Sequence, residues 1–68
     1  MNTKLLIEFR ERKQYSQEQM ARMLDYKSKG SYCLIECGKT KVYIDLDNRI
    51  SKMLELNQKE ILDLFFNI

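Results

Sequence analysis

Residues 16–39, which read SQEQMARMLDYKSKGSYCLIECGK, decide the fold of this chain. Their apolar side chains recur three or four residues apart, which is the period of an amphipathic helix and not of a strand. Ser16 followed by Gln19 has the form of a capping box, in which each side chain accepts from the other residue's backbone N–H, and it predicts the start of a helix. A second helix is expected from Ser28 until Gly38 ends it as a C′ glycine. The segment therefore predicts two short helices joined by a tight turn.

The rest of the sequence has the same helical spacing. Helices are expected over residues 3–13, 16–24, 28–37, 44–54 and 57–67. Asn57 and Glu60 repeat the capping-box pattern at the start of the last helix. The side chains expected in the core are Leu6, Phe9, Met20, Ala21, Leu24, Tyr32, Ile35, Ile44, Ile50, Met53 and Leu54. Residues 1–68 are thus expected to form one compact all-α domain of five helices.

Composition narrows the class of protein. The absence of Pro and the presence of only two Gly disfavour an all-β fold with many tight turns. The longest apolar run is three residues and the first residues lack a signal-peptide pattern, so we expect a cytoplasmic protein that does not enter a membrane. The chain has no His, the commonest general base and metal ligand, which disfavours an enzyme. We expect no cofactor and no small-molecule ligand.

Two cysteines, Cys33 and Cys37, lie four residues apart on the helix expected over 28–37. A closed zinc site needs two further Cys or His ligands, and the chain has none. A disulfide between them is awkward because both belong to one helix. We therefore expect reduced thiols and no metal site.

Charge is unevenly distributed along the chain. Residues 1–41 hold nine Lys or Arg against five Asp or Glu, whereas residues 42–68 hold three against five. A basic part joined to an acidic part can give a molecule two electrostatic faces. Ordinary scatter of surface charge accounts for the same numbers, so charge alone identifies no partner.

Several short patterns occur in register: Phe9-Arg10, Ser16-Gln17, Ala21, Ile35-Glu36-Cys37-Gly38-Lys39 and Ile50-Ser51-Lys52-Met53-Leu54. In this combination nearly the whole chain resembles the lambda-repressor/Cro (XRE-like) family of DNA-binding proteins. The resemblance implies a lambda-repressor-like domain whose second and third helices form a helix-turn-helix. The sequence departs from the family at Gln14, often Gly, at Val42, often Pro, and in a turn over 25–28 that is one residue longer.

The resemblance also implies roles for individual residues. The positions that would face base edges in the major groove are Lys29, Gly30, Ser31, Cys33 and Leu34. Those that would contact phosphates are Gln17, at a helix N-terminus, and Lys27, Lys39, Thr40 and Lys41. The base-facing set lacks Arg, Asn and Gln. Part of the specificity would therefore come from DNA shape, or from the side chain of Arg12 or Lys27 extending to a base edge.

Two further features concern assembly. Arg10 and Glu36 match positions that pair across the first and third helices, and we expect a partly buried, bidentate ion pair. The last residues are apolar on nearly all sides of the expected helix, and the family usually dimerises through this region, so Leu56, Leu62 and Phe66 are expected at a homodimer interface. A loose C-terminal tail, with Phe66 and Ile68 frayed, is the alternative.

The sequence therefore predicts a transcriptional regulator, most simply a repressor, that binds double-stranded DNA at a palindromic operator as a homodimer. Its small size fits a control protein of a phage or another mobile element. The alternative is a protein-interaction module, such as an antitoxin or an anti-repressor, that keeps the fold but lacks specific DNA readout.

Overall fold

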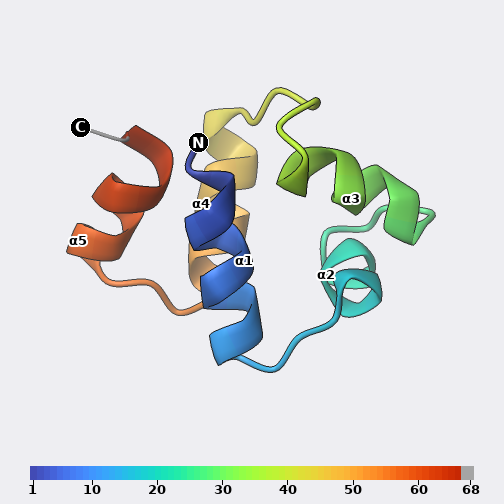
Figure 1. Ribbon diagram of the computed structural model, residues 1–68, viewed down its shortest axis with the longest axis horizontal. Coiled ribbons are helices and arrows are strands. Elements are labelled where there is room, and N and C mark those ends of the chain that lie inside the picture. The colour runs from blue at the N-terminus through green and yellow to red at the C-terminus, as the bar shows by residue number, and fades with distance from the viewer. Residues whose placement is uncertain (67–68) are drawn as a thin grey trace.

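Five helices follow one another in the computed structural model, which describes residues 1–66 (Figure 1). They are α1 (Thr3–Arg12), α2 (Gln17–Met23), α3 (Lys29–Glu36), α4 (Ile44–Met53) and α5 (Gln58–Ile61), and α5 continues directly into a π-helical turn, η1 (Leu62–Phe66). No strand occurs within residues 1–66, so the all-α prediction is confirmed for this range. The predicted extension of the last helix to Asn67, and the apolar Ile68, lie outside the described residues.

Both predicted capping boxes are present. Ser16 Oγ accepts from the backbone N–H of Gln19 at 3.0 Å, and Gln19 Oε1 accepts from that of Ser16 at 2.8 Å. Asn57 and Glu60 form the same reciprocal pair at the start of α5, at 2.8 and 3.0 Å. Ser28 occupies the N-cap of α3, but its side chain makes no capping hydrogen bond.

Helices α1 to α4 all end in the same way. The residue after each C-cap adopts the left-handed conformation: Gln14, Asp25, Gly38 and Glu55 have φ of 60°, 63°, 76° and 52°. At the end of α3 the N–H of Gly38 donates to the carbonyl of Ile35, and the N–H of Lys39 donates to that of Leu34, which is the Schellman arrangement. Only one of the four residues is glycine. The other three accept a backbone conformation that costs an L-residue about 1–2 kcal/mol.

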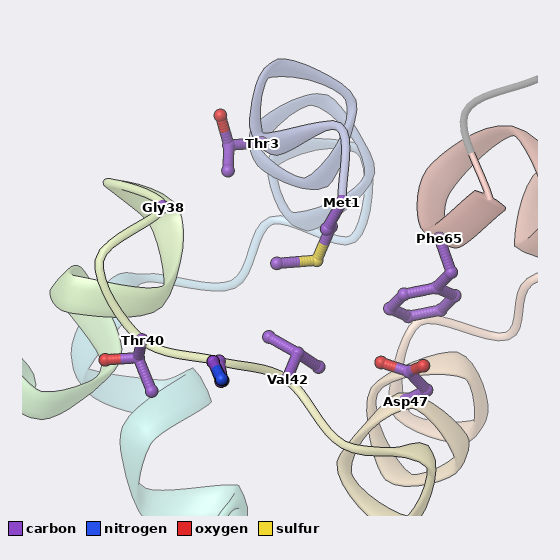
Figure 2. A pocket seen from close by; sticks show the side chains of 8 residues that line it. Met1, Thr3, Gly38, Thr40, Val42, Asp47 and Phe65 are labelled. Carbon is purple, nitrogen blue, oxygen red and sulfur yellow. The ribbon is translucent and has the colours of Figure 1, made fainter.

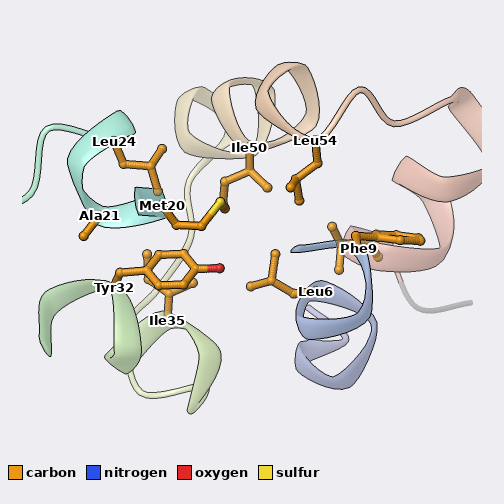
Figure 3. Close-up of a cluster of buried hydrophobic side chains, with 10 residues drawn as sticks. Leu6, Phe9, Met20, Ala21, Leu24, Tyr32, Ile35, Ile50 and Leu54 are labelled. Atoms are coloured by element: carbon orange, nitrogen blue, oxygen red, sulfur yellow. The ribbon is translucent and has the colours of Figure 1, made fainter. Parts of the chain in front are cut away.

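The core lies between α1, α2, α3, α4 and η1. Its buried apolar side chains are Leu6, Phe9, Met20, Ala21, Leu24, Tyr32, Ile35, Ile50, Leu54 and Leu64. Figure 3 shows Leu6 on α1 directed toward Ile50 and Leu54 on α4, with the side chains of α2 and α3 filling one side. The predicted core is thus confirmed with three qualifications: Met53 is partly buried, Ile44 is exposed, and the buried Leu64 was not predicted.

The prediction for Ile44 was wrong because of its place on α4. It is the first residue of that helix and lies six residues before the buried Ile50, which is about 240° around the helix axis. Its side chain therefore faces solvent and is 76% exposed.

The helices divide into two groups around α1 and α4. α2 and α3 pack against each other on one side, and α5 lies on the other (Figure 1). α1 contacts both α3 and η1, so it connects the two groups. No helix in the described part of the chain is long and apolar enough to cross a lipid bilayer.

Candidate nucleic-acid interface

The outer face of α3 is open to solvent. The helix buries Tyr32, Ile35 and Glu36, which lie on one side of it at helical spacing. All five residues predicted to face base edges have solvent exposure: Lys29, Gly30 and Leu34 are exposed, and Ser31 and Cys33 are half-buried. α3 lies at the periphery of the molecule, and its inner neighbours are α2 and α1 (Figure 1).

The single acidic residue of α3, Glu36, is turned inward and fully paired. Its side chain is 4% exposed. Arg10 Nε donates to Glu36 Oε2 at 2.7 Å, and Gln17 Nε2 donates to Glu36 Oε1 at 2.8 Å. Arg10 Nη1 also donates to the carbonyl of Tyr15 at 2.8 Å. One carboxylate therefore connects α1, α2 and α3, and no acidic side chain remains on the outer face of α3.

This network corrects one expectation and bears on another. The ion pair between Arg10 and Glu36 is present, but it is not bidentate, because the second carboxylate oxygen accepts from Gln17. A buried carboxylate needs a donor for each oxygen, and the amide of Gln17 supplies the second. One side-chain N–H of Gln17 thus binds Glu36, which leaves the second amide N–H and the backbone N–H groups at the start of α2 for the expected phosphate contact.

Tyr32 lies next to this network and is fully buried. Its hydroxyl has no hydrogen-bond partner among residues 1–66. Burial, and then the neighbouring carboxylate of Glu36, raise the pKa of Tyr32 above its usual range. The tyrosine is therefore a neutral core residue that supports α3 from inside.

Most basic residues away from α3 are already neutralised. Of the twelve Lys and Arg, five form ion pairs with carboxylates: Arg10, Arg12, Lys13, Arg22 and Arg49. Arg12 pairs with Glu60 and lies over the ring of Phe9, 4.7 Å from its centroid, so it does not extend toward α3 as one interpretation of the sequence required. Arg49 binds Asp25 and the carbonyl of Met23 at the end of α2.

Four exposed lysines lie at the two ends of α3 and form no ion pair within the described residues. Lys27 and Lys29 are at its start, and Lys39 and Lys41 follow its end. We refer to these four as the α3-flanking lysines. Because no carboxylate lies within 4.0 Å of them in residues 1–66, their charge is available to an external anion.

Thr40, the remaining predicted phosphate contact, is half-buried and lies beside a pocket of about 240 Å³. Figure 2 shows this pocket between the start of α1, the loop from α3 to α4, and η1. It is lined by Met1, Thr3, Gly38, Thr40, Lys41, Val42, Asp47 and Phe65. One carboxylate oxygen of Asp47 is buried without a hydrogen-bond partner among residues 1–66, and burial raises the pKa of this group. Thr40 and Lys41 thus lie between the outer surface and this pocket.

The predicted dimer contacts separate into two kinds. Leu62 and Phe66 are exposed, by 46% and 60%, and lie four residues apart at the C-terminal end. Leu56 is half-buried and packs against the core of its own chain, so only part of its side chain is open to a partner.

Tyr43 and Ile44 are an exposed apolar pair that the sequence analysis missed. They are 70% and 76% exposed, more than any other large apolar residue described, and they lie two and three residues after Lys41. The apolar run Val42-Tyr43-Ile44 directly after a basic stretch is a signal that could have identified them.

Taken together, the described residues place an open helix face without acidic groups between two pairs of unpaired lysines. Such a surface can approach a polyanion closely, since its charge is not offset by nearby carboxylates. Comparison with protein-family models, curated proteins and solved structures finds no match for this chain.

Proposed function

We propose that this protein is a DNA-binding transcriptional regulator in which α2 and α3 act as a helix-turn-helix and α3 enters the major groove. The observation that carries the proposal is the outer face of α3, which is exposed, free of acidic side chains and bordered by the α3-flanking lysines. The inward, fully paired Glu36 is what keeps that face free of negative charge.

The dimensions of α3 suit this role. Eight residues give a helix of about 12 Å, and a helix with its side chains is about as wide as the major groove. Lysines at both ends of α3 then lie near the phosphates that border the groove on its two sides. These contacts orient the protein and supply affinity independent of sequence.

Base recognition falls to a small set of side chains. Lys29 can donate to guanine O6 and N7, Ser31 can bond to either kind of base edge, and the exposed Leu34 can pack on a thymine methyl. Gly30 permits close approach of the backbone. Because few side chains contact base edges, the deformability of the DNA supplies the remaining discrimination between sequences.

We propose that the regulator acts as a homodimeric repressor, and the C-terminal surface supports the dimer. Leu62 and Phe66 provide exposed apolar side chains for an isologous contact between two copies. A two-fold dimer of this kind would present its two α3 helices about 34 Å apart, one turn of DNA, and would bind a palindrome.

Selection of bound sequences from a random duplex pool at about 150 mM salt tests the proposal. We expect an enriched palindromic motif, and Lys29→Ala is expected to relax preference at one base step in each half-site. Lys52→Ala is the matched control, since Lys52 is also exposed and unpaired in the described residues but lies on α4. A pool without any enriched motif would contradict the proposal.

One observation favours a second candidate, a protein-interaction module. Tyr43 and Ile44 expose a large apolar area directly beside Lys41, and an apolar patch next to a basic loop suits an acidic protein partner better than a phosphate backbone. The double variant Lys39→Glu with Lys41→Glu distinguishes the two candidates, because it should abolish DNA binding if the protein is a DNA-binding regulator. Unchanged biological activity of that variant, together with one stable protein partner lost on Tyr43→Ser, would favour the second.

A further inference from the structure

The two cysteines of α3 converge on its outer side. Cys33 Sγ and Cys37 Sγ are 3.9 Å apart, and neither is in a disulfide. Cys33 is half-buried and Cys37 is exposed, so solutes can reach the pair. Residues four apart on a helix have Cβ atoms about 5–6 Å apart, and the shorter sulfur separation means that the side chains lean toward each other.

The sulfur separation distinguishes between two kinds of thiol chemistry. A disulfide would require the sulfurs to approach by about 1.9 Å, to the 2.05 Å of an S–S bond, within one rigid helix. Thiolate–metal bonds of about 2.3 Å would place two sulfurs about 4.6 Å apart around a linear ion. The observed 3.9 Å corresponds to an S–metal–S angle of about 116°, so side-chain shifts below 1 Å suffice for any angle from there to linear.

The surroundings limit which ion fits. No group of three or more His, Cys, Asp or Glu side chains gathers anywhere in residues 1–66, which disfavours cations that need four protein ligands. Two thiolates alone are a donor set for a soft cation of low coordination number. Lys39 and the buried, paired Glu36 both lie near Cys37, so a dithiolate complex would have one positive and one negative neighbour.

We propose that Cys33 and Cys37 form a chelating dithiol that binds one soft, two-coordinate cation per chain, with Cu(I) as the representative ion. The two thiols lose two protons, and two S–Cu bonds form without a change of oxidation state. The product is a bis-thiolate complex with a net charge of −1.

A regulatory consequence rests on the proposed function. Cys33 lies on the face of α3 that would approach base edges, so a bound ion and its negative charge would occupy that space. Cu(I) would therefore lower DNA affinity, by about tenfold on the usual scale of coupling between sites.

The site itself is tested without DNA, by competition for Cu(I) between the intact chain and a chromogenic Cu(I) chelator under anaerobic conditions. We expect one ion per chain, and a loss of about 100-fold in affinity for Cys33→Ser and for Cys37→Ser, because each removes one arm of a two-point chelate. A variant with Cys33→Ser and Ser31→Cys keeps two thiols but puts them about 240° apart on the helix, and it should bind as weakly as a single-thiol variant. Wild-type affinity in that variant, or one ion per two chains, would overturn the proposal.

DNA binding is then measured for the same proteins with and without Cu(I). DNA binding by the metal-free wild type tests the proposed function alone, whereas the metal competition tests the dithiol alone. Loss of DNA affinity on Cu(I) addition in the wild type, but not in the variant with Cys33→Ser and Cys37→Ser, supports the coupling. Equal DNA affinity of metal-loaded and metal-free wild type would refute the coupling.

Discussion

Replacing Lys39 and Lys41 with Gln should change how DNA affinity depends on salt. Each lysine that contacts a phosphate displaces condensed counterions and contributes about 0.9 to the slope of log affinity against log salt. Of the four α3-flanking lysines, Lys29 is assigned to a base edge and three per chain to phosphates, so a dimer has six such contacts and a slope of about −5.4. The double variant keeps two contacts per dimer, and its slope should be about −1.8.

These slopes differ by an amount that is easily measured. Between 50 and 200 mM salt, affinity should fall by about 1,800-fold for the wild-type dimer and by about 12-fold for the variant. Fluorescence anisotropy with a labelled operator duplex, titrated at four salt concentrations, gives both slopes. Below 50 mM salt the wild type should bind DNA more tightly than the double variant, and the plots of log affinity against log salt for the two proteins should converge as salt increases.

The matched control is the variant with Lys52→Gln and Lys59→Gln. It removes the same charge from lysines that are also exposed and unpaired in the described residues but lie on α4 and α5. Its slope should remain at the wild-type value. If Lys39→Gln with Lys41→Gln leaves the slope unchanged, or if the control lowers it equally, then affinity depends on net charge and the placement of DNA against α3 is wrong.

Three further predictions concern stability. Glu36→Ala leaves Arg10 without its buried partner and should lower the free energy of unfolding by about 3–5 kcal/mol, measured by urea denaturation; a loss below about 1 kcal/mol would contradict the central place of this carboxylate. Gln14→Gly should raise the free energy of unfolding by about 0.5–1 kcal/mol because it relieves a left-handed backbone. Gly38→Ala should lower it by about 1 kcal/mol, since the added Cβ would make only an ordinary van der Waals contact with Thr3 Cγ2 at 3.9 Å and the cost is conformational; equal signs for the two would refute the backbone explanation. Asp47→Asn should raise the melting temperature at pH 7 but not at pH 3, because burial raises the pKa of this carboxyl. The penalty for its ionised form is absent below a pH of about 3.8 and develops as the pH rises through the folded-state pKa. The same gain in melting temperature at both pH values would exclude ionisation as the cause.

The parts of the fold that could be predicted from the sequence depend on near neighbours. The capping boxes at Ser16 and Asn57 each involve residues three apart, so their spacing alone located the starts of α2 and α5. The helical period identified nine of the ten buried apolar side chains as core residues. Ile44 was assigned wrongly because it was grouped with Ile50, although six residues of α4 place the two about 240° apart around the helix axis.

The candidate interface was predictable as a surface but not in its electrostatics. The exposed positions of α3 follow from its period, and Lys29 and Leu34 are on the expected side. Gln17 has an unremarkable place at the start of α2, and nothing near it in sequence shows that its amide binds a carboxylate nineteen residues away. The packing of Leu56 against the core was likewise not visible in the sequence.

The sequence by itself therefore determined where helices begin and end and which side of most of them is apolar, because these properties arise from interactions within about one helical turn. Tertiary structure decided which of twelve basic residues are neutralised, and it left the lysines around α3 unpaired within residues 1–66 while Arg12 bound Glu60, 48 residues away. Pairing of that kind depends on which chain segments become neighbours when the core closes, and ionic contacts follow that geometry since charges on a protein surface interact strongly only at short range. The electrostatic character of this surface is thus a product of packing, although every residue that forms it is visible in the sequence.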